Sequence, residues 1–84
     1  MQSNKITSEQ IKAARHAISL SNHEIAQATG IGIATLRRYE ASQGVPKSRK
    51  GHLELLKSYF EARGIEFVGA PDAGPGIRIW QRGG

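Results

Sequence analysis

Signals for the start of a helix recur three times in the first half of the chain, and they constrain its fold more than any other feature. Thr7 and Gln10 have the spacing of a capping box, and Ser21 and Glu24 repeat it. Apolar residues flank both boxes as hydrophobic staples, and the staple spacing returns around Gly32. Helices must therefore stop and restart in quick succession. The predicted helices cover about 6–20, 22–29 and 33–42.

The second and third predicted helices are separated only by Gly30-Ile31-Gly32. Gly30 suits the left-handed conformation that ends many helices, because it has no side chain to clash. A helix, a tight glycine-containing turn and a second helix together indicate a helix-turn-helix unit. After a basic loop (residues 44–50), apolar spacing predicts a fourth helix over about 49–63.

Beyond Gly64 the pattern changes. Short β-branched and aromatic runs at 65–69 and 76–81 flank a turn-rich segment at 70–75, which predicts a β-hairpin. The fold class is therefore mainly α, a four-helix helix-turn-helix domain with a C-terminal β-hairpin. We divide the chain into a domain at 1–64 and a hairpin at 65–84.

Composition and charge narrow the classes of molecule that the chain is expected to bind. The 84 residues include 12 Lys and Arg against 7 Asp and Glu, a net charge of +5, and the excess is concentrated in 1–21 and 45–64. A focused basic excess favours a polyanion such as nucleic acid. Cysteine is absent, no apolar run approaches the ~20 residues of a membrane span, and the start lacks a secretory signal. We expect a cytoplasmic protein that does not associate with membranes.

Residues 21–40 resemble the helix-turn-helix of phage-repressor and Cro-like transcription regulators, the XRE family, and the resemblance extends over about 6–63. It implies a sequence-specific regulator, in the first place a repressor, that binds double-stranded DNA as a homodimer without a cofactor. The third helix would enter the major groove. The matching positions are Ile25, Ala26, Gly30, Ile31, Leu36 and Tyr39.

The resemblance also implies which residues read bases. These positions are Gly32, Ile33, Ala34 and Arg38, with Thr35 and Arg37 at the margins. The chain departs from the family here, because apolar Ile33 and Ala34 can touch a thymine methyl but cannot hydrogen-bond to bases. Arg38 is then the main candidate for recognising guanine. Two alternatives stay open: both arginines contact only phosphates, and Ile33 is buried against the second helix.

Phosphate contacts are expected at two places. One is the start of the second helix at Ser21 and Asn22, where free N–H groups and the helix dipole favour anions. The other is the basic loop, which could instead be a solvated surface run. The resemblance further implies an ion pair between Arg15 and Glu40. The loop residues expected to bind phosphate are Lys47, Ser48, Arg49 and Lys50.

The hairpin is the expected dimerisation element, because a lone hairpin is marginal in water and an open edge strand invites pairing with a second copy. Alternatively, it only covers its own core. A competing function is an antitoxin-like or other protein-interaction module, which Trp80 would anchor. The hairpin residues expected at the dimer contact are Ile65, Phe67, Ile77, Ile79 and Trp80.

Catalysis is not expected. The three histidines, His16, His23 and His52, lack metal-ligand spacing and are interpreted as surface residues. The single aspartate, Asp72, leaves no obvious carboxylate pair for acid–base chemistry. We therefore predict no enzyme activity, metal or cofactor.

Overall fold

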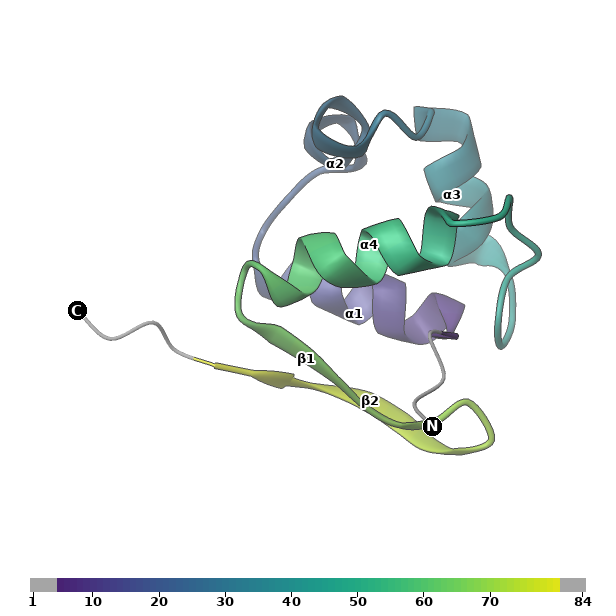
Figure 1. Cartoon of the computed structure of the whole chain (residues 1–84), viewed down its shortest axis with the longest axis vertical. Coiled ribbons are helices and arrows are strands. Elements are labelled where there is room, and N and C mark those ends of the chain that lie inside the picture. Colours follow the sequence, from purple (N-terminus) through teal and green to yellow (C-terminus); the bar gives the residue numbers. More distant parts are fainter. Residues whose placement is uncertain (1–4, 81–84) are drawn as a thin grey trace.

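The computed structural model describes residues 5–80, which form four helices followed by a two-stranded antiparallel hairpin (Figure 1). This order of elements confirms the predicted layout. Gln81, which is predicted to end the second strand, lies outside the described residues. So do residues 1–4 of the predicted domain (1–64) and residues 81–84 of the predicted hairpin region (65–84). The elements are α1 (Ser8–Ala17), α2 (Asn22–Thr29), α3 (Ile33–Ala41), α4 (His52–Glu61), β1 (Ile65–Ala70) and β2 (Ala73–Ile79).

Both predicted capping boxes are present. The Thr7 hydroxyl accepts a hydrogen bond from the Gln10 backbone N–H, and the Gln10 side chain accepts one from the Thr7 N–H. Ser21 and Glu24 make the same reciprocal pair at the start of α2. Gly30 ends α2 in the predicted left-handed conformation, with φ of 80°. Local sequence therefore sets where the first two helices begin and where the second ends.

Several element boundaries differ from the predictions. The first helix ends at Ala17 rather than at residue 20, because Ser19 has a φ of 55° and the chain turns towards α2. The fourth helix begins at His52 rather than at residue 49, because Gly51 has a φ of 85°, which a right-handed helix cannot include. The hairpin turn is also shorter than expected, since β1 reaches Ala70 and β2 starts at Ala73.

The core draws on all four helices and on the first strand. In Figure 1, α2 and α3 lie on one side of α4 and the hairpin lies on the other, with α1 behind α4. Strand β1 packs against α4, and β2 packs against α1. The buried apolar residues are Ile6, Ile11, Ala14, Ile25, Ile31, Leu36, Tyr39, Leu56, Phe60 and Ile65.

Gln10 fixes the hairpin to α1. The Gln10 Nε2 group donates to the carbonyl oxygens of Val68 and Gly76, at 3.1 and 2.8 Å, and these two residues are partners across the hairpin. The Gln10 side chain is almost fully buried. One amide therefore caps α1 with its oxygen and holds both strands with its nitrogen.

Candidate nucleic-acid interface

Helix α3 presents an open outer surface. Ala34, Arg37 and Arg38 are exposed, whereas Ile33 and Thr35 are half-buried. The N-cap residue before the helix is Gly32, which is exposed and has no side chain to cap it. The first turn of α3 therefore offers backbone and short side chains, and the arginines are the long polar groups on this surface.

Neither Arg37 nor Arg38 is paired with a carboxylate among residues 5–80, where the ion pairs are Arg15–Glu40 and Arg78–Glu66. The Arg38 guanidinium lies 5.7 Å from the centroid of the neighbouring Tyr39 ring, a loose cation–π contact. Unpaired guanidinium groups keep all their donors for an external acceptor, and their planar fork matches a guanine edge or a phosphate.

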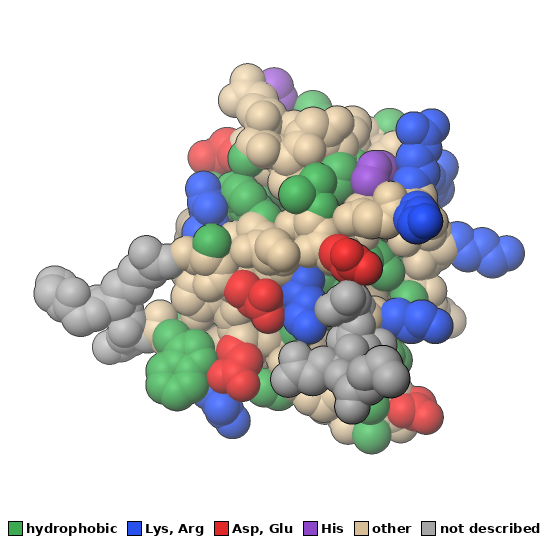
Figure 2. All heavy atoms as spheres, viewed as in Figure 1, with side chains coloured by type: hydrophobic (Ala, Val, Ile, Leu, Met, Phe, Trp, Pro, Cys, Tyr) green, Lys and Arg blue, Asp and Glu red, His purple; other side chains and the backbone are tan. Residues whose placement is uncertain are grey.

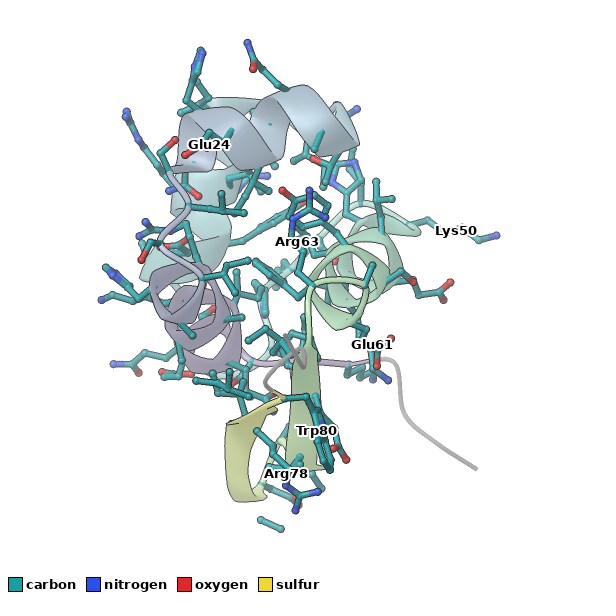
Figure 3. The ribbon with its side chains drawn as sticks, turned by 90° about the vertical axis from the view of Figure 1, so that its left-hand side faces the viewer. Glu24, Lys50, Glu61, Arg63, Arg78 and Trp80 are labelled. Atoms are coloured by element: carbon teal, nitrogen blue, oxygen red, sulfur yellow. The ribbon has the colours of Figure 1, made fainter. Side chains whose placement is uncertain are left out.

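The basic loop lies beside α3. Lys47, Ser48, Arg49 and Lys50 are all exposed, and Figure 2 shows Lys and Arg side chains gathered on the right-hand side, where Figure 1 places α3 and this loop. In Figure 3, Lys50 points away from the body of the molecule. The structure thus places the basic loop beside α3, on the side of the molecule where Lys and Arg side chains gather.

The start of α2 is occupied by its own capping box. The Ser21 hydroxyl accepts from the Glu24 N–H, and the Ser21 N–H and hydroxyl both donate to one Glu24 carboxylate oxygen, at 3.0 and 3.1 Å. The carboxylate already occupies the positive end of the helix dipole and would repel a phosphate. The side-chain Oδ1 of half-buried Asn22 is shielded and has no partner among residues 5–80. The Ser21 hydroxyl and N–H are therefore engaged within the capping box, and a phosphate contact at Ser21 and Asn22 stays a prediction.

The hydrogen bonds from Ser21, the backbone one first, lower the pKa of Glu24 below its ordinary value. Because the folded-state pKa is depressed, the stabilisation by this cap is present above the unfolded-state pKa and is lost as the pH falls through the folded one. At neutral pH the cap is ionised and complete.

Arg15 and Glu40 form a two-pronged ion pair. Arg15 Nε lies 2.7 Å from Glu40 Oε2, Arg15 Nη2 lies 2.9 Å from Oε1, and Arg15 Nη1 donates to the Leu20 carbonyl. The side chains are 18% and 10% exposed. The hydrogen bond and the charge of Glu40 raise the pKa of Arg15 against the opposing effect of burial. The pair ties α1 to the end of α3 and fixes the direction of α3.

Most of the predicted dimer contact faces inward. Ile65 is buried, and Phe67 and Ile77 pack half-buried against the core, because the hairpin covers α1 and α4 with this face. Ile65 is not available to a partner, which corrects the prediction for this residue, whereas a dimer contact at Phe67 and Ile77 stays a prediction. Ile79 and Trp80 remain 56% and 57% exposed. The Trp80 indole donates to Glu66, beside Arg78 (Figure 3).

Sequence reasoning missed two groups beside the basic loop. Tyr39 was interpreted as an apolar core position, but its buried hydroxyl bonds to His52 Nδ1 at 2.7 Å and accepts from the Arg49 N–H at 3.3 Å. His52 is half-buried rather than on the surface. The available signal was the tyrosine itself, since a tyrosine hydroxyl in a core needs a partner.

Comparison with family models, curated proteins and solved structures gives no match for this chain. Within residues 5–80, no helix combines the length and hydropathy needed to cross a bilayer. In the same part of the chain, no three His, Cys, Asp or Glu side chains come together as metal ligands.

Proposed function

We propose that this protein is a sequence-specific regulator of transcription, in the first place a repressor, that inserts α3 into the major groove of double-stranded DNA. The observation that carries the proposal is that the exposed side of α3 and the basic loop lie beside each other. Helix α3 holds two exposed arginines that have no carboxylate partner among residues 5–80, and the basic loop with its exposed cations lies beside this helix (Figure 1).

The two surfaces suit different parts of a duplex. An α-helix fits the major groove, where an arginine can donate two hydrogen bonds to guanine, and Ala34 can touch a thymine methyl. Loop cations lie at the flank, where they can neutralise phosphates. Under this proposal Arg38 reads a base, Arg37 lies at the margin, and Lys47, Arg49 and Lys50 contact the backbone.

The proposal includes a homodimer with residues 65–84 at the contact. A single recognition helix covers few base pairs, and a two-fold dimer would read two half-sites about one helical turn apart. The exposed Ile79 and Trp80 support this surface, and so do the outer edges of the sheet, on which no third strand pairs among residues 5–80. The contact is then a strand edge with two apolar side chains rather than a broad apolar face.

Substitution of Arg38 and of the loop cations tests the proposed roles. Arg38→Ala should relax base preference at one position of the binding site, at a cost of about 1–3 kcal/mol there. Lys47→Ala and Arg49→Ala should weaken binding to all sequences alike and reduce the salt slope by about one unit each. Affinity measured on a panel of single-base variants at several salt concentrations separates the two effects. An unchanged preference in Arg38→Ala would leave Arg38 as a phosphate ligand only.

A second candidate is a protein-interaction module of the antitoxin type. The exposed Trp80 and Ile79 at the end of the hairpin favour it, because a tryptophan often anchors an interface. Copurification of one partner at equal stoichiometry, together with no measurable DNA binding, would support this function over the first.

A further inference from the structure

Tyr39 joins the inner side of α3 to the basic loop and to the start of α4. We propose that its hydroxyl is a positioning group for DNA binding, because it holds the loop cations in one place relative to the helix that reads bases. This inference rests on the proposed function, whereas the hydrogen bonds of the Tyr39 hydroxyl can be tested without it.

Three segments meet at this hydroxyl. The Tyr39 side chain is fully buried, its oxygen lies 2.7 Å from His52 Nδ1, and the Arg49 N–H donates to it at 3.3 Å. The His52 N–H donates to the Arg49 carbonyl at 3.0 Å, which closes a tight turn over Lys50 and the left-handed Gly51. The last residues of the basic loop are therefore fixed at both ends of this turn.

The donor and acceptor roles follow from the chemistry of the groups. A backbone N–H can only donate, so the Tyr39 oxygen accepts from Arg49. The Tyr39 hydroxyl donates to Nδ1 in the neutral tautomer of His52 that carries its hydrogen on Nε2, and it accepts from Nδ1 in the other tautomer. In both cases, removal of the hydroxyl leaves the Arg49 N–H and His52 Nδ1 without this partner.

A fixed backbone in this turn matters for the loop cations, because their side chains are not themselves fixed by ion pairs among residues 5–80. Lys47, Arg49 and Lys50 are exposed and make no ion pair among residues 5–80. If the turn were loose, binding would have to order its backbone as well as these side chains, and the ordering would weaken the complex. A fixed turn avoids the backbone part of that loss for every DNA sequence equally.

The test is Tyr39→Phe, with Tyr59→Phe as the matched control. Both substitutions remove one hydroxyl, but the hydroxyl of Tyr59 makes no hydrogen bond within the described residues. The Arg63 guanidinium carbon lies 4.0 Å from the centroid of the Tyr59 ring, a contact that the substitution keeps. We expect Tyr39→Phe to speed hydrogen exchange at the Arg49 amide and to weaken binding to all duplexes about three- to tenfold. Base preference should not change. Tyr59→Phe should alter neither readout.

Substitution of His52 provides a rescue. In His52→Asn the side-chain oxygen can take the place of Nδ1 as acceptor, so exchange and affinity should stay near those of the unmodified protein. His52→Leu has no acceptor and should resemble Tyr39→Phe. An unchanged affinity in Tyr39→Phe, or an altered base preference, would overturn the inference.

The proposed function fails separately from this inference. It fails if the unmodified protein binds no duplex, whereas exchange at the Arg49 amide is measured without DNA. Suppose that the unmodified protein binds DNA and that Tyr39→Phe speeds exchange at the Arg49 amide without loss of affinity. Only the positioning role is then contradicted.

Discussion

Gln10→Glu is expected to lower the free energy of unfolding by about 3–5 kcal/mol, although it keeps the size of the side chain and the acceptor that caps α1. The Nε2 group donates to the carbonyls of Val68 and Gly76, and a carboxylate cannot donate. The substitution would place a negative charge against two carbonyl oxygens in a site that is 3% exposed. Urea unfolding at pH 7 measures the loss.

The second capping box supplies the control. Glu24→Gln makes the reverse exchange at the equivalent position of α2, where the side chain is exposed and holds no strand. It should cost far less than Gln10→Glu, as surface substitutions usually do. If Gln10→Glu leaves too little folded protein, Gln10→Met removes the donors without adding charge and should fall between the two.

The pH dependence adds a further check. Burial raises the pKa of the introduced carboxyl, so its penalty is complete above the folded-state pKa and shrinks as the pH falls towards the unfolded-state value of about 4.3. A protonated carboxyl can again donate one hydrogen bond. Equal small losses in Gln10→Glu and Glu24→Gln at pH 7 would show that Gln10 does not hold the hairpin.

The Arg15–Glu40 pair should give the second large effect. Arg15→Ala and Glu40→Ala are each expected to cost about 2–3 kcal/mol, less than in a fully buried pair because both side chains keep some contact with water. The double variant should cost less than the sum, with a coupling energy of about 1–2 kcal/mol. Chemical unfolding of the four proteins measures this cycle.

The same cycle repeated at high salt separates the buried pair from an ordinary surface one. Screening should remove little of the coupling between the two side chains, because their contact is largely shielded from solvent. Arg78 and Glu66, which are 58% and 43% exposed at 3.2 Å, offer the comparison and should show little coupling at any salt concentration. Strictly additive losses for Arg15 and Glu40 would contradict their role in fixing α3.

The helix order could be predicted because its signals are local. Capping boxes at Thr7 and Ser21 act through hydrogen bonds three residues apart, and Gly30 ends α2 through its own backbone freedom. The start of α4 was predicted too early because no side-chain cap marks it before Leu53, the first apolar residue of the helix, whereas the left-handed Gly51 decides the boundary. The pairing of Arg15 with Glu40 came from the family resemblance, since spacing alone does not bring these residues together.

The groups that connect distant segments could not be predicted. Gln10 was recognised as a cap, but its nitrogen bonds to residues 58 and 66 positions away, which only the folded chain brings near. The Tyr39 hydroxyl and His52 likewise meet through the path of the basic loop. The engagement of Ser21 by Glu24 could be predicted from the capping box, whereas the phosphate contact at the start of α2 stays a prediction.

Selection of bound duplexes from a random pool tests the central claim most directly. The full-length protein should enrich a two-fold-symmetric site whose half-sites lie about one helical turn apart, with a guanine that loses its preference in Arg38→Ala. Recovery of no enriched sequence, at salt concentrations low enough to retain non-specific binding, would contradict the assignment of α3 as a helix that reads DNA.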